Sequence, residues 1–347
     1  MCEHSLIPHP EWQDFISIFW KNGKSLLVLG GVDSGKTSFL LWVLQKLLEK
    51  KFKVALLDSD IGQSTIGTPA VVGVECFLDF PKSLPVILPA YWEFVGVVSP
   101  REDTTSFLEA IASSYLWVKK VSPDKLLIDT TGFIKGEEAL AIKKSKIKLL
   151  SPTYVVILGK VEEELYLLKH YIENLCISKV FILPPSPALK LKSHQQRIAY
   201  RNTVLESYFK DFLTCSLSWE EVKIPGIPLG EGRELPIYVK ERISSVLNQP
   251  VYYAERIKQF LYLALPFYPD INDMQILKEH FKVEKVFRLW FKDLLGVLVG
   301  EGGKQLSITL VKELDFNLHR IIFKKPPTIA LSQIKSIKIG RYSLTDI

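Results

Sequence analysis

Short apolar runs alternate with amphipathic stretches along the first part of the chain. Residues 25–29 form a largely apolar run, a Gly-rich turn follows them, and residues 38–48 have the apolar spacing of a buried helix. A second apolar run, at residues 54–57, ends in two aspartates separated by one residue. Because strand, helix and strand follow one another within about thirty residues, this region predicts a βαβ unit and a parallel sheet covered on both faces.

The same alternation continues further along the chain. It predicts strands at residues 126–128, 154–158 and 180–183 and helices at residues 137–150 and 162–172. Before them, residues 64–101 are irregular and rich in Pro and Gly. In a doubly wound fold such loops lie over the carboxyl ends of the strands, where ligands bind. The predicted fold class is therefore α/β, with a doubly wound, mainly parallel sheet.

The pattern changes beyond residue 215. Prolines and glycines interrupt residues 225–236. Short strands separated by turn signals are predicted after them, at residues 295–299, 306–311 and 320–323. We therefore predict three parts, which are a short lead-in helix at residues 1–20, an α/β domain at residues 21–215 and a smaller β-rich C-terminal domain at residues 216–347.

The composition is that of an ordinary folded protein. Of the 347 residues, 47% are hydrophobic and 24% are charged, and this length suffices for two domains. The four cysteines are scattered without a CxxC pair, which argues against a zinc site or a disulfide framework and is typical of a reducing cytoplasm. No apolar run approaches the ~18–20 residues of a membrane span, and the first residues lack the pattern of a signal peptide. We therefore expect a cytoplasmic protein with no membrane partner.

Residues 30–37 read Gly-Gly-Val-Asp-Ser-Gly-Lys-Thr and match the phosphate-loop pattern G-x-x-x-x-G-K-S/T at every fixed position. A predicted strand precedes them and a predicted helix follows, a context that a chance Gly-rich turn would lack. The loop backbone can wrap a phosphate, Lys36 can bridge the β- and γ-phosphates of ATP, and the Thr37 hydroxyl can bind Mg²⁺. The predicted cofactors are therefore ATP and Mg²⁺. The predicted cofactor-binding residues are Gly30, Gly31, Asp33, Ser34, Gly35, Lys36, Thr37 and Ser38.

Carboxylates follow two of the predicted strands. Asp58 and Asp60 are two residues apart at a strand end, so both side chains face the same side, toward the metal and the transferred phosphate. Asp58 and Thr37 are the predicted metal site, and Asp60 could accept the proton of an attacking hydroxyl. Asp129 ends a further strand in the form of a Walker-B or switch-type motif. Each of these aspartates could instead cap a solvated turn, where Asp is common.

Six segments occur in an order that is typical of one family of kinases. They are the phosphate loop with Asp33 inside it, Asp58-Ser59-Asp60-Ile61-Gly62-Gln63, Gly96-Val97-Val98-Ser99-Pro100, Thr131-Gly132-Phe133-Ile134-Lys135-Gly136, Leu183-Pro184-Pro185-Ser186-Pro187, and Arg197-Ile198-Ala199-Tyr200-Arg201 followed by Tyr208-Phe209. Together they resemble the polynucleotide 5′-hydroxyl kinase family. That family includes the RNA-kinase subunit of the pre-mRNA cleavage factor and the nucleolar kinases of pre-rRNA processing.

The resemblance implies a fold and a reaction. The chain is expected to have a P-loop NTPase fold and to transfer the γ-phosphate of ATP to the 5′-hydroxyl end of RNA or DNA, with Asp60 as the general base. The resemblance also implies a lid that carries Arg197 and Arg201, which share one face of a helix. With Lys36, these arginines would stabilise the transferring phosphoryl group. The implied catalytic residues are Lys36, Asp60, Arg197 and Arg201.

Substrate contacts are implied by the same segments. Ser99 and Pro100 match a clasp that holds the substrate end, where the family usually has Thr-Pro, and Phe133 stands where the family usually has a base-stacking Trp. Phe keeps an aromatic face, and stacking contributes ~1–3 kcal/mol per base. Gln63 is expected to orient either the water shell of the metal or the substrate. The implied substrate-binding residues are Gln63, Ser99, Pro100, Thr131 and Phe133.

Two other functions are compatible with these residues. One is a hydrolytic P-loop NTPase of the switch or chaperone type, in which Asp60 would position water, and the other is a non-catalytic ATP-binding scaffold. The net charge of +6 is compatible with a nucleic-acid partner but is shared by many proteins without one. The sequence does not distinguish RNA from DNA or single strand from duplex. It indicates no protein partner, no oligomeric state and no role for the C-terminal domain.

Overall fold

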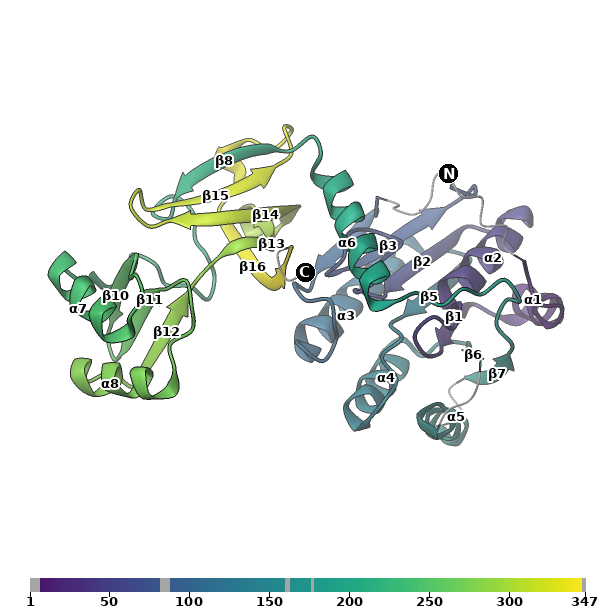
Figure 1. The fold of residues 1–347 in the computed structure, drawn as a ribbon. Coiled ribbons are helices and arrows are strands. Elements are labelled where there is room, and N and C mark those ends of the chain that lie inside the picture. The colour runs from purple at the N-terminus through teal and green to yellow at the C-terminus, as the bar shows by residue number, and fades with distance from the viewer. Residues whose placement is uncertain (1–6, 82–87, 160–162, 176–177, 345–347) are drawn as a thin grey trace. The chain divides into compact units, whose positions relative to one another are not determined.

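The computed structural model describes residues 7–81, 88–159, 163–175 and 178–344 of the chain. The chain divides into two compact units, residues 1–208 and residues 209–347 (Figure 1). The first six residues of the predicted lead-in segment lie outside the described ranges, and helix α1 (Glu11–Asn22) follows them. No helix of the described residues is both long and apolar enough to cross a membrane.

The first unit is built on one seven-stranded sheet. Its strands are β1 (Ser25–Leu29), β2 (Val54–Ser59), β3 (Val71–Phe77), β4 (Tyr91–Phe94), β5 (Lys125–Thr130), β6 (Tyr154–Leu158) and β7 (Lys179–Leu183). They lie in the order β4-β3-β2-β5-β1-β6-β7. Neighbouring strands are parallel from β2 to β7, whereas β3 and β4 are antiparallel at one edge. The prediction of a mainly parallel sheet is confirmed.

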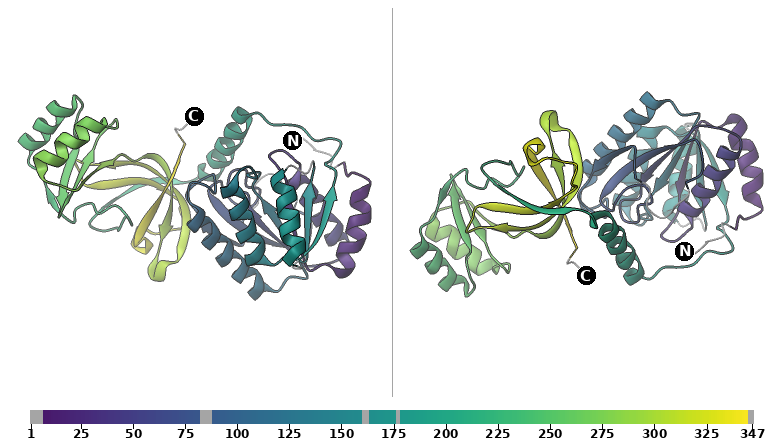
Figure 2. Two further views of the ribbon diagram at one scale, coloured as in Figure 1. Left: turned by 90° about the horizontal axis from the view of Figure 1, so that it is seen from below. Right: turned by 90° about the horizontal axis from the view of Figure 1, so that it is seen from above.

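Helices cover both faces of this sheet (Figure 2). Besides α1 they are α2 (Lys36–Glu49), α3 (Thr104–Val121), α4 (Glu137–Leu150) and α5 (Glu163–Leu175). A further helix, α6 (His194–Phe209), contacts the loop that follows β2. In β1, Leu27 and Leu29 belong to a hydrophobic cluster with residues of α3 and α4, whereas Leu26 and Val28 belong to a second cluster with residues of α1 and α2. Successive strand residues point to opposite faces, so these clusters lie on the two faces of one doubly wound sheet.

Part of the segment that was predicted to be irregular forms β3 and β4. Gly73 lies inside β3, where an added Cβ would lie 2.3 Å from the Ile66 carbonyl oxygen. A glycine inside a strand weakens the apolar pattern that predicts strands, which explains why the sequence did not indicate this one. The correction matters for the site, because β3 pairs with β2 up to Asp58 and covers that edge of the parallel strands.

The register of the central strands brings two carboxylates side by side. Strand β5 lies between β2 and β1, and Asp58 of β2 pairs with Asp129 of β5. All three strands are parallel, so their carboxyl ends meet at one edge of the sheet. The phosphate loop after β1 is therefore adjacent to the end of β5, and the end of β2 lies one strand further away.

The second unit contains two sheets. The five-stranded sheet has the order β16-β13-β14-β15-β8, and its neighbouring strands are antiparallel. Its strands are β8 (Leu213–Ser218), β13 (Lys292–Val299), β14 (Gln305–Asp315), β15 (Arg320–Lys325) and β16 (Ser336–Ser343). The three strands predicted in this part of the chain are confirmed as parts of β13, β14 and β15.

The chain between β8 and β13 forms the smaller sheet, of order β12-β11-β10-β9, together with two helices. These elements are β9 (Arg233–Glu234), α7 (Ile237–Leu247), β10 (Tyr253–Ile257), β11 (Phe260–Ala264), α8 (Ile271–Phe281) and β12 (Lys285–Leu289). The sequence did not predict the helices α7 and α8. Strand β8 pairs with β15 along its whole length, so the division that was placed after residue 215 falls inside a strand of the second unit.

Candidate active site

The phosphate loop joins β1 to α2 through a backbone with two left-handed residues. Gly35, directly before α2, has φ 84°, and Asp33 has φ 54°. Glycine adopts this region readily, and Asp tolerates it better than most residues. An added Cβ on Gly30 would lie 2.4 Å from the Ser34 hydroxyl oxygen and 2.8 Å from the Leu158 carbonyl oxygen. The loop is therefore tight enough to surround a phosphate group, with the N–H groups of the first turn of α2 directed into it.

Lys36 is folded back over the phosphate loop. The residue is 5% exposed, and its Nζ donates to the Gly31 carbonyl oxygen at 2.7 Å. Burial lowers the pKa of Lys36, and the neighbouring carboxylates, of which Asp129 is the strongest, oppose that shift. The ammonium group thus lies inside the loop, where the β- and γ-phosphates of a nucleotide bind in P-loop proteins.

The Thr37 hydroxyl has a carboxylate partner at the end of the adjacent strand. Its Oγ1 donates to Asp129 Oδ2 at 2.6 Å, and Asp129 Oδ1 accepts from the Thr130 backbone N–H at 2.8 Å. Burial raises the pKa of Asp129, and the nearby Asp60 adds to the shift, whereas the hydrogen bond from Thr37 opposes it. A P-loop hydroxyl beside a Walker-B carboxylate is the pair that holds Mg²⁺ in P-loop NTPases.

Asp58 has a different set of partners from the one that the sequence suggested. Its Oδ1 accepts from the Asp60 backbone N–H at 2.9 Å, and its Oδ2 accepts from the backbone N–H groups of Thr65 and Ile66 at 2.6 and 3.0 Å. Burial raises the pKa of Asp58 to about 8, with a smaller contribution from Asp129. Asp58 therefore organises the loop that follows β2. The structure places Asp129, and not Asp58, against Thr37, because β5 is the strand next to β1.

Asp60 opens the turn that follows β2. Its Oδ1 accepts from the backbone N–H groups of Gly62 and Gln63, both at 3.2 Å, which fixes the direction of the side chain. Within the described residues, no donor lies within hydrogen-bond distance of its Oδ2. The negative charge of the carboxylate also favours the protonated form of Lys36 in the phosphate loop, against the larger effect of burial. Asp60 thus combines a fixed orientation, a half-exposed position and an oxygen that can take a proton.

Two other segments contact the Asp60 turn. Gln63 Nε2 donates to the Arg197 carbonyl oxygen at 3.2 Å, and its Oε1 is buried without a hydrogen-bond partner. The Tyr200 hydroxyl, whose pKa burial raises to about 12, donates to the Ser64 carbonyl oxygen at 3.0 Å. On the other side, an added Cβ on Gly62 would lie 3.0 Å from the Val98 carbonyl oxygen. The structure therefore brings the turn together with α6 and with the loop that carries the predicted clasp, Ser99 and Pro100.

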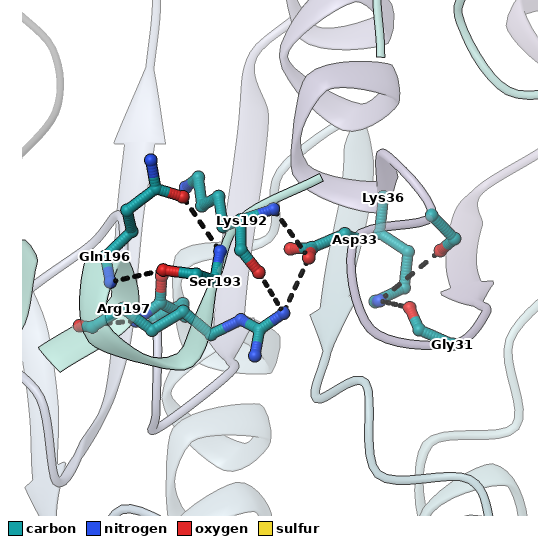
Figure 3. A network of polar contacts seen from close by, with 9 residues as sticks. Gly31, Asp33, Lys36, Lys192, Ser193, Gln196 and Arg197 are labelled. Carbon is teal, nitrogen blue, oxygen red and sulfur yellow. Dashed lines mark hydrogen bonds and ion pairs between the residues drawn. The ribbon is translucent and has the colours of Figure 1, made fainter. Parts of the chain in front are cut away.

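The predicted lid residues lie in the first half of α6. Figure 3 shows the Arg197 guanidinium beside the Asp33 carboxylate of the phosphate loop, with Lys36 on the other side of Asp33. The Arg197 Nη2 donates to Asp33 Oδ2 at 2.6 Å and to the Lys192 carbonyl oxygen at 2.8 Å. Arg201 follows one turn later and is half-buried. Of the two predicted lid arginines, the structure thus shows Arg197 in contact with the loop.

The segment after β5 packs directly on the phosphate loop. An added Cβ on Gly132 would lie 2.7 Å from the Cα of Val32. Thr131 is 6% exposed. Phe133 is half-buried and packs against the hydrophobic cluster on the α3 and α4 side of the sheet. The structure therefore places Gly132, between Thr131 and Phe133, against the phosphate loop, with Phe133 packed partly on the protein core.

Two buried lysines beneath the carboxylates were not identified from the sequence. Lys143 and Lys146 on α4 are each 1% exposed. Lys143 Nζ donates to the Thr131 carbonyl oxygen at 2.6 Å, and Lys146 Nζ donates to the Ser59 hydroxyl at 2.8 Å, which in turn donates to the Asp129 carbonyl oxygen. Burial lowers the pKa of Lys146 to about 7, although the nearby carboxylates oppose this shift. Both lysines occupy the apolar face of α4. Their position among the apolar residues of the predicted helix was the signal in the sequence that could have indicated their burial.

Comparison with known proteins shows what this chain is similar to. Residues 30–211 match the family model described as mRNA cleavage and polyadenylation factor CLP1 P-loop. The chain is 28% identical to a polyribonucleotide 5′-hydroxyl-kinase of Pyrococcus furiosus, over 92% of this chain and 88% of that protein. It is 27% identical to a protein of the same name from Methanocaldococcus jannaschii, over 91% of this chain and 86% of that protein.

A solved structure of a Clp1p–Pcf11p complex supports the fold. The TM-score to it is 0.64 at 12% sequence identity, and the match covers 96% of this chain and 79% of that chain. At this identity the likeness concerns the arrangement of the elements. Because it covers 96% of this chain, it includes residues of both units.

Proposed function

This chain belongs to the CLP1 P-loop family, and from that membership we propose that it is an ATP-dependent polynucleotide 5′-hydroxyl kinase. The membership also confirms the family that the six sequence segments resemble. The archaeal relatives named as polyribonucleotide 5′-hydroxyl-kinases match nearly the whole of this chain and most of their own length. The proposed reaction class follows the names of these relatives, and the use of ATP follows from the P-loop family.

The observation that carries the proposal within the site is the position of Asp60. Its side chain is oriented by two backbone N–H groups, and its carboxylate is close enough to Lys36 to oppose the lowering of the lysine pKa by burial. Transfer of a phosphoryl group to a hydroxyl needs a group that takes the hydroxyl proton beside the loop that holds the phosphates. Asp60 meets both requirements.

The loop residues fit ATP together with Mg²⁺. Mg²⁺ keeps several waters and binds phosphate oxygens, so one hydroxyl and one carboxylate suffice in P-loop proteins. The Thr37 hydroxyl and the Asp129 carboxylate, 2.6 Å apart, are such a pair. We therefore propose Thr37 and Asp129 as the residues that hold the metal, in place of Thr37 and Asp58. When bound, Mg²⁺ neutralises charge on the β- and γ-phosphates.

The side chains of the protein position the reacting groups and move one proton. The 5′-oxygen bonds to the γ-phosphorus while the bond from that phosphorus to the β–γ bridging oxygen breaks, and Asp60 accepts the hydroxyl proton. Such a base typically contributes about 10²–10⁴-fold in rate. Lys36 and Arg197 stabilise the charge on the transferring group. Ser99 and Pro100 hold the substrate end, since their loop lies against the Asp60 turn.

The test is transfer of label from γ-labelled ATP to matched 5′-hydroxyl RNA and DNA oligonucleotides. Asp60→Asn keeps the shape of the side chain and removes its basic oxygen, and Asp14→Asn, at an exposed position on α1, is the matched control. We expect label on the oligonucleotide with the unchanged protein and with Asp14→Asn, and a loss of at least about 10²-fold with Asp60→Asn. Comparing the two oligonucleotides also ranks RNA against DNA.

Two results would contradict the proposal. Free labelled phosphate without labelled oligonucleotide would identify a hydrolytic NTPase, in which Asp60 positions water. Bound ATP that never loses its γ-phosphate would identify a scaffold. A third result, full transfer by Asp60→Asn, would support the kinase activity and contradict only the role of Asp60 as the general base.

A further inference from the structure

Asp33 of the phosphate loop directs its carboxylate away from the loop and toward α6. Its Oδ2 accepts from the Lys192 backbone N–H at 3.0 Å and from Arg197 Nη2 at 2.6 Å. The side chains of Asp33 and Arg197 are 15% and 24% exposed, so this ion pair is largely screened from water. The contact joins segments that are 164 residues apart in the chain. Figure 3 shows that Asp33 stands between Lys36 and the start of α6.

The backbone conformation of Asp33 indicates that its carboxylate, and not its conformational freedom, distinguishes it from glycine at this position. Its φ of 54° lies in the left-handed region, which glycine adopts without strain and which this loop uses again at Gly35. A phosphate loop needs conformational freedom at such a position and needs no carboxylate, since a carboxylate repels phosphate. The negative charge at Asp33 is therefore explained by its two partners, Arg197 in the first turn of α6 and the Lys192 N–H in the segment that leads into the helix.

The start of α6 is fixed by its own sequence. Ser193 Oγ accepts from the Gln196 N–H at 3.1 Å, and Gln196 Oε1 accepts from the Ser193 N–H at 2.8 Å. This reciprocal pair is a capping box, which sets where a helix begins. Arg197 directly follows it, and its Nη2 also donates to the Lys192 carbonyl oxygen. The capping box forms the turn, and Asp33 attaches the turn to the phosphate loop.

Arg197 has a buried donor without a partner in the described part of the chain. Its Nε is buried and has no hydrogen-bond partner among the described residues, while Nη2 is held by Asp33 and Lys192. An unsatisfied buried donor is unfavourable, more so when it is charged, so its presence calls for an explanation such as a bound anion or water. The planar guanidinium fork is suited to phosphate oxygens.

We propose that Asp33 is a positioning residue, which docks the first turn of α6 on the phosphate loop and orients Arg197 toward the transferring phosphoryl group. This inference rests on the proposed phosphotransfer and assigns Asp33 to the lid, whereas the sequence suggested that it binds the nucleotide. Asp33 touches neither reacting atom. Its effect on the reaction passes through Arg197.

A double-mutant cycle tests the inference. Asp33→Asn keeps a side chain that tolerates the left-handed region and removes the charge that holds Arg197. We expect it to lower kcat about 10–100-fold, with the KM for ATP changed less than about threefold, because the interaction acts mainly in the transition state. In an Arg197→Ala background the same substitution should have no further effect. An equal loss in both backgrounds would show that Asp33 acts on the nucleotide directly and would overturn the inference.

Further variants separate positioning from folding. Asp33→Glu restores the charge and should recover part of the kcat lost in Asp33→Asn, whereas Asp33→Gly, which relieves the backbone but has no carboxylate, should not. Glu49→Gln, which breaks an exposed ion pair with Lys46 on α2, is the matched control and should leave kcat unchanged. A Glu variant no better than Gly would contradict a role for the charge.

Hydrogen exchange of α6 gives a readout that does not depend on the acceptor. We expect the amides of residues 194–200 to exchange at least about tenfold faster in Asp33→Asn, because local opening follows the loss of the docking contact. Unchanged exchange would overturn the docking role. If the protein releases labelled phosphate without labelling an oligonucleotide, the kinase proposal fails, and the same cycle on the hydrolysis rate still decides the role of Asp33.

Discussion

The strand-end carboxylates and the first turn of α6 form two sides of one site, and they are held there by different interactions. Asp58 and Asp129 are 2% and 3% exposed, and their oxygens accept hydrogen bonds from the backbone and from Thr37. The first turn of α6 is largely exposed and is joined to the phosphate loop by polar contacts, such as Arg197 with Asp33.

Because of this difference, we expect the carboxylates to be rigid and the first turn of α6 to be able to move. A buried network opens only when much of the surrounding core opens, whereas an exposed turn with few apolar contacts detaches at small cost. Phosphotransfer needs both, because the metal and the base must be preorganised while the nucleotide must enter and leave. Substitutions in the carboxylate network should therefore change activity and stability, and substitutions in the α6 turn should act mainly on activity.

The largest effect is expected from Asp129→Asn. The substitution keeps the size of the side chain and removes the charge beside Thr37, so kcat for phosphate transfer should fall at least about 10²-fold, the scale of losing one positioned electrostatic group. The Mg²⁺ concentration for half-maximal binding of ATP, measured by calorimetry, should rise. A kcat within threefold of the unchanged protein would show that the Thr37–Asp129 pair does not hold the metal.

Asp58→Ala should act first on stability. It leaves the buried backbone N–H groups of Thr65 and Ile66 without an acceptor, which costs about 1–3 kcal/mol in the free energy of unfolding. Urea denaturation measures this loss, with Asp14→Ala as the exposed control. A stable Asp58→Ala that instead loses Mg²⁺-dependent binding of ATP would return Asp58 to the metal site.

Lys146→Met should change how stability depends on pH. The folded pKa of Lys146, about 7, lies below its ordinary value of 10.5, so between these values the unfolded chain binds a proton that the folded chain does not. This contribution to stability is present at high pH and is lost as pH falls toward 7. Met has no such charge, so the variant should gain about 2 kcal/mol relative to the unchanged protein between pH 9 and pH 7.

The carboxylates near Lys146 affect the result of this experiment, and an exposed lysine of the same helix provides its control. Asp60, Asp129 and Asp58 act on Lys146. Loss of its positive charge leaves the pKa values of Asp129 and Asp58, which burial already raises, higher still, and this shifts the difference in the same direction. Lys148→Met, at an exposed position on the same helix, should show no pH-dependent difference in urea denaturation. A pH-independent difference for Lys146→Met would mean that Lys146 titrates outside this range.

The smallest effect on stability is expected from Ser193→Ala. Removal of the capping box costs about 0.5–1 kcal/mol, and that loss is confined to the start of α6. The global unfolding free energy should therefore hardly change, whereas kcat should fall several-fold because the turn that orients Arg197 frays. Gln195→Ala, exposed beside the capping box, is the control. Equal kcat for both variants would show that the turn is held by Asp33 alone.

Much of the fold and part of the site could be predicted because they depend on neighbouring residues. The phosphate loop is a contiguous motif between a strand and a helix, and Asp60 follows its strand directly, so their placement needs no knowledge of distant contacts. β3 and the helices α7 and α8 were missed. Gly73 interrupts the strand pattern, and α7 and α8 have 11 residues each, too few for a strong periodic signal.

The sequence by itself determined the family, the α/β class, the phosphate loop and the segments that gather around it, because each is written in residues that lie close together in the chain. The tertiary structure decided which side chains are partners. Thr37 meets Asp129 because β5, and not β2, lies beside β1. Asp33 meets Arg197 because α6 returns to the loop. Such pairings depend on strand order and chain path, which the whole core selects and no local pattern encodes.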